Sequence, residues 1–437
     1  MAGQVGQMLM GLIDTLMVGH LGTVPLAGAA FGTSLVSVAF VFGIGLLTSV
    51  GVLASQAHGA RMEQTIRTIL PSSVWLSFTA GAILAILLES LQPWFFLFRQ
   101  PQDVLDQALP FLVIIGWSLV PALGYMNAKI FCESLSKPLV PMLMMYLGVS
   151  LNIFLNWVLI FGNLGAPTLG LTGAGWATLI SRIVTVCGTL CYCMWLTGSD
   201  PGNLSPARAR PTIIWSLVKL GLPVGFQLLS EVSAFAFAAI LMGLIGTQAL
   251  AAHQIAITCA ATTFMFPLGI SQAVTVRIGQ AVGARYHSTV RTIASSGIAL
   301  SGLIMLAFAA LYLSQSKSIG AMFSNDPEVV ALAASLLVIA GLFQLADGVQ
   351  VTAMGALRGL ADVRVPMLLV FTFYWLLAIP ISCFAAFVCK AGAAGIWNGL
   401  AIGLFIAAVT LTTRVWWLTR PGKPYEVLVG SERGTIL

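Results

Sequence analysis

The chain has 437 residues, of which 58% are hydrophobic and only 8% are charged. Soluble domains carry about 25% charged residues, so this composition excludes an ordinary soluble protein and indicates an integral membrane protein. The net charge of +6 comes from basic residues in loops, and we expect no nucleic-acid partner. The seven cysteines have no spacing typical of a metal site or a disulfide framework, so we expect neither a resident metal nor a cofactor.

Apolar runs separated by turn residues predict an all-α membrane fold. A spanning helix needs about 20 apolar residues, and the chain holds twelve such runs. We expect helices near residues 1–19, 29–55, 69–92, 106–130, 139–161, 172–196, 214–243, 252–277, 289–314, 329–356, 364–388 and 393–418. Proline, glycine and asparagine stand at the breaks between them, as in Asn325-Asp326-Pro327.

The second half of the chain repeats the first. Residues 19–61 align without a gap on residues 243–285, at an offset of 224 (243 minus 19). Shared pairs include Gly22/Gly246, Thr23/Thr247, Leu26/Leu250, Phe40/Phe264, Phe42/Phe266, Gly45/Gly269 and Gln56/Gln280. We therefore predict two six-helix lobes, 1–197 and 214–418, joined by a linker at 198–213 and followed by a tail at 419–437. Because six is even, the lobes share one orientation and are related by an axis along the membrane normal.

The basic residues predict the orientation in the membrane. Only Arg99, Lys317 and Lys390 fall in loops on one side, whereas sixteen lysines and arginines fall on the other. Cytoplasmic loops carry the excess of basic residues, so we expect both termini, the linker and the tail to be cytoplasmic. The predicted location is the plasma (inner) membrane, with many spans.

The first predicted helix is short. Met1 aligns with Gly225, so the counterpart of residues 215–224 is missing. We expect either an N-terminal truncation or a misassigned start, with a naturally short helix as the alternative, and we predict no signal peptide.

Three acids lie inside predicted spans: Asp14, Glu231 and Asp347. A carboxylate at the bilayer centre costs roughly 2.5–3.5 kcal/mol on insertion scales. Burial disfavours its charged form, so such a group can take up a proton, bind Na⁺ or pair with an organic cation, but not all at once. That exclusion is the physical basis of antiport. The alternative is that these acids only fix helix packing; Arg182, the one basic residue inside a span, can neutralise at most one of them.

Amide side chains accompany these acids. Gln344 and Gln350 lie three residues either side of Asp347, and we expect all three on one helix face. Gln227 precedes Glu231 by four residues, and Asn152 and Asn156 form an i, i+4 pair that we expect to make a polar pocket near Asp14. The competing interpretation is interhelical hydrogen bonding, worth roughly 0.6 kcal/mol on average. His253 is interpreted as a capping or packing residue or as a proton-sensitive group.

Five motifs resemble the multidrug and toxic compound extrusion (MATE) family, in its NorM-like branch. They are residues 10–22 (MGLIDTLMVGHLG), 152–157 (NIFLNW), 221–231 (GLPVGFQLLSE), 251–255 (AAHQI) and 343–350 (FQLADGVQ). The resemblance spans the chain except for the missing start, and it implies a cation-coupled exporter of cationic, lipophilic compounds.

The resemblance also implies site residues. Glu231 and Asp347 match the family's cation site in the C-terminal lobe, where H⁺ or transient Na⁺ would bind, and Asp14 with Asn152 and Asn156 matches the N-terminal site. The other expected cavity residues are Gln227, Gln344, Gln350, Phe343, Gln254 and His253. Many NorM-like members carry Tyr where this chain has Phe343, which removes a hydroxyl from the Na⁺ site. We expect a monomer in contact with membrane lipid that works by a rocking switch of the lobes.

Three alternative functions fit the sequence less well. A flippase for lipid-linked substrates shares the wider superfamily architecture, but it needs a strongly basic cavity, and only Arg182 is available. A major-facilitator symporter needs a basic loop after its second helix, which residues 59–63 match poorly. A membrane enzyme needs a metal or nucleophile motif, and the sequence contains no HExxH or GxSxG, so we do not expect an enzyme.

Overall fold

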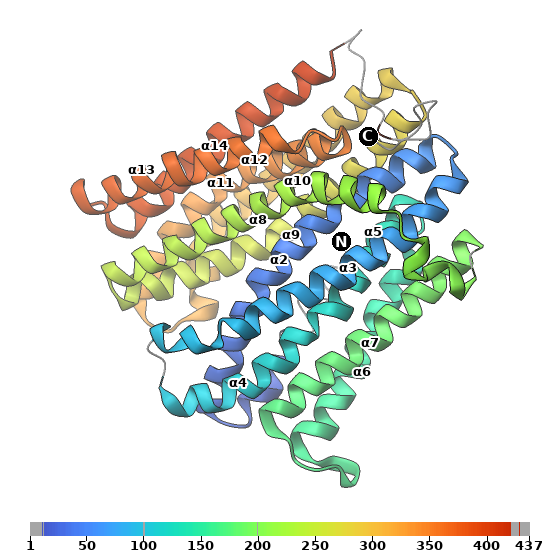
Figure 1. Cartoon of the computed structure of the whole chain (residues 1–437). Coiled ribbons are helices and arrows are strands. Elements are labelled where there is room, and N and C mark those ends of the chain that lie inside the picture. The colour runs from blue at the N-terminus through green and yellow to red at the C-terminus, as the bar shows by residue number, and fades with distance from the viewer. Residues whose placement is uncertain (1–10, 12, 99–100, 199, 421–427, 429–437) are drawn as a thin grey trace. The chain divides into compact units, whose positions relative to one another are not determined.

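The computed structural model describes residues 11, 13–98, 101–198, 200–420 and 428, and within these residues every regular element is helical (Figure 1). After a helical stretch at 13–19, the first elements are α2 (Thr23–Gly59), α3 (Glu63–Ser90), η1 (Gln92–Phe98), α4 (Gln102–Trp117), α5 (Leu119–Ser134), α6 (Leu139–Phe161), η2 (Asn163–Gly165) and α7 (Gly170–Thr197). Next come η3 (Pro201–Leu204), η4 (Pro206–Arg208), α8 (Pro211–Ile245), α9 (Thr247–Gly283), α10 (His287–Phe323) and α11 (Pro327–Gly359). The chain closes with α12 (Arg364–Phe371), η5 (Thr372–Ala378), α13 (Ile379–Cys383), η6 (Phe384–Val388) and α14 (Gly392–Leu418).

The described part contains 11 helices that are long and apolar enough to cross a membrane, which confirms the predicted all-α membrane fold. α4 and α5 count together as one span, as do the four elements from α12 to η6. Most helices extend beyond their predicted ends; α9, for example, was expected at 252–277 and runs Thr247–Gly283. Hydropathy does not register these polar helix ends because they extend past the hydrocarbon layer. The predicted short start falls largely on residues 1–10, outside the described part.

The chain divides into two compact units, one ending at Gly225 and also holding Leu428, the other spanning Phe226–Val427. The boundary lies inside α8 rather than in the 198–213 segment. In the first unit α2 packs against α4 and α5, and α7 packs against α5 and α6. α8 joins this unit through glycines: a Cβ at Gly45 would lie 2.5 Å from the Cα of Gly225, so only small residues allow this approach.

The second unit is built around α11, which packs against α9, α10 and α14 (Figure 1). Its contact with α9 is close because Gly355 has no side chain; a Cβ there would lie 2.5 Å from the carbonyl oxygen of Ser271. The Ser271 hydroxyl donates to Val351 O at 2.6 Å, and the Thr275 hydroxyl donates to Gly355 O at 2.8 Å. These contacts fix the helix that carries Gln344, Asp347 and Gln350.

The repeat predicted from sequence is present in the backbone. α2 and α9 each have 37 residues, and their first residues, Thr23 and Thr247, differ by 224. Each helix ends in a tight turn whose arginine has a positive φ, 56° at Arg61 and 61° at Arg285. Equal helix lengths and equal turns show that the two halves share one local design.

The span at residues 364–388 has the bounds expected from sequence but not a uniform helix. Two π-helical stretches, Thr372–Ala378 and Phe384–Val388, flank a short α-helical turn that contains Pro380. Proline cannot donate an N–H to the preceding turn, and wider turns occur often at functional sites. Tyr374 lies in the first of these wide turns.

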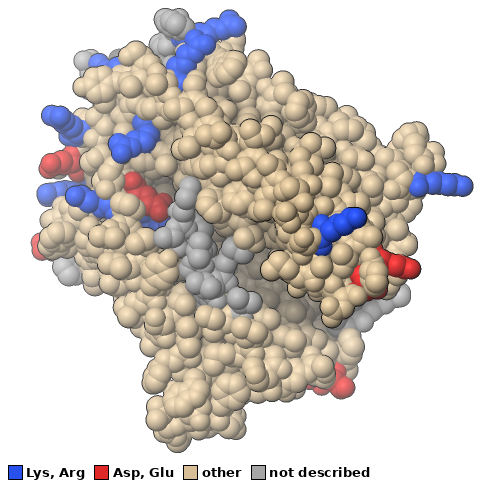
Figure 2. Space-filling view, turned by 180° about the vertical axis from the view of Figure 1, so that it is seen from behind, with Lys and Arg blue, Asp and Glu red and all other residues tan. Residues whose placement is uncertain are grey.

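The exposed surface is suited to lipid. On the face drawn in Figure 2, acidic and basic residues occupy little of the area and uncharged residues occupy most of it. Large apolar side chains are exposed on several spans, among them Ile83, Leu244 and Leu303. A water-exposed surface of this kind would aggregate, whereas a bilayer solvates it.

Candidate functional site

The centre of the polar cluster in the second unit is Glu231 on α8. The Gln350 side chain donates from Nε2 to Glu231 Oε1 at 2.9 Å, and the Tyr374 hydroxyl donates to the same oxygen at a longer 3.5 Å. Gln350 Nε2 also lies 3.2 Å from the Tyr374 hydroxyl oxygen. Three helical segments, α8, α11 and η5, therefore meet at one carboxylate.

Packing holds this cluster rigidly. Gln350 and Tyr374 are almost wholly buried, and the Tyr374 ring packs edge-to-face on Phe235. The neighbouring Trp375 indole donates to Ser230 O at 3.1 Å, which ties η5 to α8 beside Glu231. The Oε1 atom of Gln350 is buried and has no hydrogen-bond partner among the described residues. An unpaired buried acceptor is costly, so the cluster is suited to an additional proton or cation.

Asp347 and Arg358 complete the charge balance of this cluster. Asp347 is half-buried on α11 and lies within electrostatic range of Glu231. Arg358, near the C-terminal end of α11, is buried and also interacts electrostatically with Glu231. Its guanidinium group donates to the Ser271 hydroxyl at 3.0 Å and to Met354 O at 3.3 Å. Glu231 thus interacts with one acid, Asp347, and one arginine, Arg358, so with all three groups ionised the cluster carries one net negative charge.

Gln344 and Gln227 act at other contacts. Gln344 donates to the Thr263 hydroxyl at 2.6 Å and to Ala260 O at 3.1 Å, so it joins α11 to α9. Gln227 donates to the sulfur of Met354 at 2.6 Å. Gln344 and Gln350 each lie three residues from Asp347, and the six residues between them separate their directions by about 120°, so the two amides reach different partners.

Phe343 and His253 lie in an aromatic layer. Phe343 is buried with its ring centroid 5.4 Å from that of Trp397. The Trp397 indole donates to His253 Nδ1 at 3.2 Å, and His253 is itself buried. Both residues therefore pack α9 and α11 against α14. Gln254, the neighbour of His253, is instead exposed on α9 and is not brought to the Glu231 cluster.

In the first unit, Asp14 ends a chain of hydrogen bonds. Asn156 donates to Asp14 Oδ1 at 2.6 Å and to Asn152 Oδ1 at 3.2 Å, and Asn152 donates to the Thr178 hydroxyl at 3.3 Å. Both asparagines are fully buried, and Asn156 Oδ1 has no hydrogen-bond partner among the described residues. The structure thus brings together the three polar residues that the sequence placed in one pocket.

Arg182 lies near this chain. Its guanidinium group donates to the Ser118 hydroxyl at 2.6 Å, stands 6.0 Å from the centre of the Phe40 ring, and interacts electrostatically with Asp14. One arginine therefore faces one carboxylate in the first unit, in contrast to the second.

Sequence reasoning missed three contributors: Thr178, Arg358 and Tyr374. Arg358 was grouped with the loop arginines because it stands two residues beyond the predicted helix end at 356, yet it is the residue before the end of α11 and its side chain is buried. Tyr374 stands in a run of aromatic residues, and nothing in the sequence distinguished its hydroxyl as a functional group. Polar side chains recur every three to four residues along α6 and α7, and this spacing could have indicated that Thr178 belongs to the cluster.

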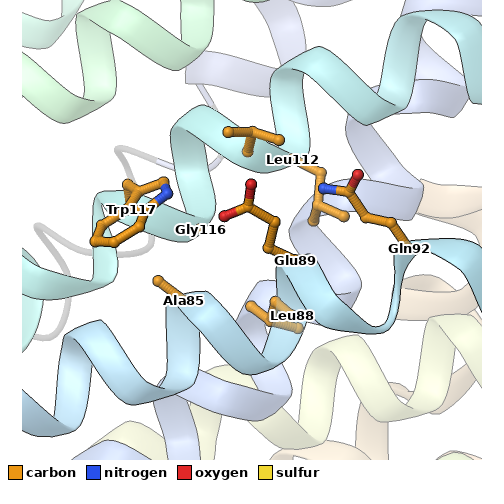
Figure 3. A pocket seen from close by; sticks show the side chains of 8 residues that line it. Ala85, Leu88, Glu89, Gln92, Leu112, Gly116 and Trp117 are labelled. Carbon is orange, nitrogen blue, oxygen red and sulfur yellow. The ribbon is translucent and has the colours of Figure 1, made fainter.

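A separate pocket lies between α3 and α4. Figure 3 shows Glu89 and Gln92 pointing toward α4 beside Leu112 and Gly116. It contains none of the predicted site residues and has no room for a ligand.

Comparisons with known proteins bear on the family and the fold of the chain. The sequence model of the family described as MatE matches residues 1–158 and 223–384. The chain is 35% identical over 423 residues to the "Probable multidrug resistance protein NorM" of Pseudomonas putida, covering 95% of this chain and 92% of the relative. It is 36% identical over 428 residues to the protein of the same description in Pseudomonas syringae pv. tomato, covering 96% and 92%. A solved structure described as "Crystal structure of MATE in the bent conformation" superposes with a TM-score of 0.86 at 20% identity, covering 95% and 93% of the two chains.

Proposed function

The chain belongs to the MatE family, and from that premise we propose that it is a multidrug efflux antiporter driven by a cation gradient. It exports cationic, lipophilic compounds in exchange for H⁺ or Na⁺. The two halves, each with its own polar cluster, alternate access by a rocking movement.

The observation that carries this proposal is the charge balance around Glu231. Glu231 interacts with both Asp347 and Arg358, so two acids and one arginine, when ionised, leave the cluster one positive charge short. A proton, a Na⁺ ion or an organic cation supplies that charge, and any one of them displaces the others. Competition for one charge deficit within a buried cluster is what an antiporter requires.

Tyr374 bears on the identity of the coupling ion. Phe343 packs on Trp397 and offers no oxygen, but the Tyr374 hydroxyl reaches Glu231 from η5. Hard cations prefer carboxylate, carbonyl and hydroxyl oxygens, and Glu231, Gln350 and Tyr374 provide this set. The absence of a hydroxyl at residue 343 is therefore no argument against Na⁺. Efflux under imposed pH and Na⁺ gradients distinguishes the two coupling ions.

The first half plays a different part in the proposal. Asp14 faces one arginine, so its cluster is balanced when ionised and does not demand a further cation. Protonation of Asp14 would weaken its oxygen as an acceptor for Asn156 and leave Arg182 unbalanced. We assign this cluster a coupling role, in which proton uptake alters helix packing, and we place drug contacts at Asn152 and Asn156.

The arrangement in the membrane is also part of the proposal. The excess of basic residues on one side places both termini in the cytoplasm, and the protein is a monomer in the plasma (inner) membrane. Residues 1–197 and 214–418 are the two lobes, with residues 198–213 and the tail 419–437 on the cytoplasmic side.

Efflux from proteoliposomes tests the function. A fluorescent drug cation is loaded, and its exit is followed under an imposed pH gradient and then under an imposed Na⁺ gradient. We expect one gradient to drive efflux in the wild type and neither to drive it after Glu231→Gln. Efflux of equal rate from the wild type and the variant would contradict the mechanism, and no drive by either ion would contradict the antiporter assignment.

A further inference from the structure

A further polar site lies in the first unit and shares no residue with either carboxylate cluster. It is a cavity of about 440 Å³ between the start of α3 and the segment that connects α7 to α8. Its lining residues are Gln64, Arg67, Thr68, Pro71, Ala207, Arg208 and Arg210. Ligand pockets commonly measure about 300–1,000 Å³, so this cavity has room for a small group.

The walls of the cavity are tied together. The Trp75 indole of α3 donates to Leu204 O at 2.7 Å, and the backbone N–H of Arg210 donates to the Ser72 hydroxyl of α3 at 3.0 Å. Leu204 packs against the apolar core of the first unit, and the Ser205 hydroxyl accepts from the N–H of Ala207. The connecting segment is therefore held on α3 on both sides of the cavity.

The cavity is strongly basic. Three guanidinium groups line it, whereas no aspartate or glutamate does. Within the described part of the chain, Arg67, Arg208 and Arg210 make no ion pair with a carboxylate. Guanidinium groups bind phosphate oxygens through paired N–H donors, and a hydroxyl and an amide, on Thr68 and Gln64, can add two more contacts. The lining therefore selects a phosphate group.

The position of the cavity indicates where that phosphate comes from. The helices on either side of the connecting segment carry exposed tryptophans near their ends, Trp195 (75% exposed) on α7 and Trp215 (68% exposed) on α8. Tryptophan is enriched at the membrane–water interface, which places the cavity at the depth of lipid headgroups. Basic pockets at the ends of spanning helices are known to bind anionic headgroups.

We propose that this cavity binds the phosphate of an anionic phospholipid headgroup, with the acyl chains lying along the apolar helix surface. The site is independent of the carboxylate clusters and of the transport mechanism. It would give the protein a fixed lipid partner at the connection between its two repeats.

The test measures lipid binding directly and does not depend on transport. The purified full-length protein in neutral detergent is titrated with fluorescent phosphatidylglycerol, with fluorescent phosphatidylcholine, and with phosphatidylglycerol in the presence of inorganic phosphate. The variants are Arg67→Gln, the double variant Arg208→Gln/Arg210→Gln, and Arg291→Gln as a matched control. Arg291 is the repeat counterpart of Arg67 (291 minus 67 is 224), is equally exposed, and does not line the cavity.

We expect phosphatidylglycerol to bind more tightly than phosphatidylcholine, and each neutralised cavity arginine to weaken that binding about fivefold. Arg291→Gln should change it little. Displacement of the lipid by millimolar inorganic phosphate would show that the lipid is held through its phosphate and would support the proposal. Equal binding to the wild type and the double variant, or an equal loss in Arg291→Gln, would overturn the proposal. Size-exclusion profiles confirm that each variant is folded.

Discussion

The polar clusters of the two halves differ far more than the helices that carry them. α5 and α11 end at Ser134 and Gly359, an offset of 225, and the turn that follows each has a positive φ, at Ser136 and Ala361. Yet at this offset Asp347 corresponds to Ala122, and Arg358 corresponds to Glu133. The repeated backbone therefore does not carry a repeated chemistry.

The difference has a consequence for charge. In the first half one arginine, Arg182, faces one carboxylate, Asp14. In the second half Glu231 interacts with one arginine, Arg358, and with a second acid, Asp347. Two similar half-bundles thus have one balanced and one negative cluster, and only the negative one needs a cation from outside. The second half is accordingly assigned the coupling-ion site, and the first half a supporting switch.

The largest effect is expected from Glu231→Gln. The amide keeps the size of the side chain and its bond from Gln350 but removes the charge that a cation must balance. Gradient-driven efflux should fall at least about tenfold, equivalent to ~1.4 kcal/mol, in proteoliposome assays. Glu89→Gln, an exposed acid at the end of α3, is the matched control and should be near wild type. Similar losses in both variants would remove the special role of Glu231.

A large stability effect is expected from Arg358→Gln. Removal of one partner from a buried charged cluster leaves the others uncompensated and costs about 3 kcal/mol in the free energy of unfolding. Thermal unfolding in detergent measures the loss. Adding Asp347→Asn to the same chain should restore part of the stability, because Asp347 no longer repels the Glu231 that has lost its arginine. Additive destabilisation by the two changes would show that Arg358 and Asp347 are not coupled.

Asp14→Asn should have an intermediate effect. The amide still accepts from Asn156, so the hydrogen-bond chain persists while the charge facing Arg182 is lost. Export should slow about fivefold, equivalent to ~1 kcal/mol, while the affinity for the drug cation changes little. Initial efflux rates and equilibrium drug binding, measured on the same preparation, separate these two quantities. A loss of drug affinity as large as that of Glu231→Gln would contradict the proposal that the two halves have different roles.

The smallest effect is expected from Tyr374→Phe. Its hydroxyl lies 3.5 Å from Glu231, and hydrogen bonds within membrane proteins average about 0.6 kcal/mol, which corresponds to a roughly threefold change. If Na⁺ is the coupling ion, the Na⁺ concentration for half-maximal efflux should rise by about that factor. Tyr286→Phe, at an exposed tyrosine, is the control. No change in Na⁺ dependence would exclude the Tyr374 oxygen as a ligand.

The backbone was largely predictable from the sequence because hydrophobic runs and identical pairs report it directly. The offset of 224 anticipated the matching α2 and α9, and α6 has the predicted bounds, 139–161. The wide turns around Pro380 were not predictable, since hydropathy is the same for an α- and a π-helical turn.

The sites were predictable only in part. The acids stood out because a charge inside an apolar run is rare, and Asn152 and Asn156 followed from their spacing. The direction of a side chain around its helix did not follow, so Gln344 was expected beside Asp347 but bonds Thr263 on α9. Arg358 and Tyr374 were missed because their role depends on interactions with Glu231, which precedes them by 127 and 143 residues, respectively.

Competition binding tests the central claim, that the coupling cation binds in the second half, most directly. A fluorescent drug cation is bound to the purified protein and displaced by Na⁺ or by lowering the pH, in the wild type, Glu231→Gln and Asp14→Asn. We predict that displacement persists in Asp14→Asn and disappears in Glu231→Gln. Displacement that persists in Glu231→Gln and disappears in Asp14→Asn would contradict the account and place the coupling site in the first half.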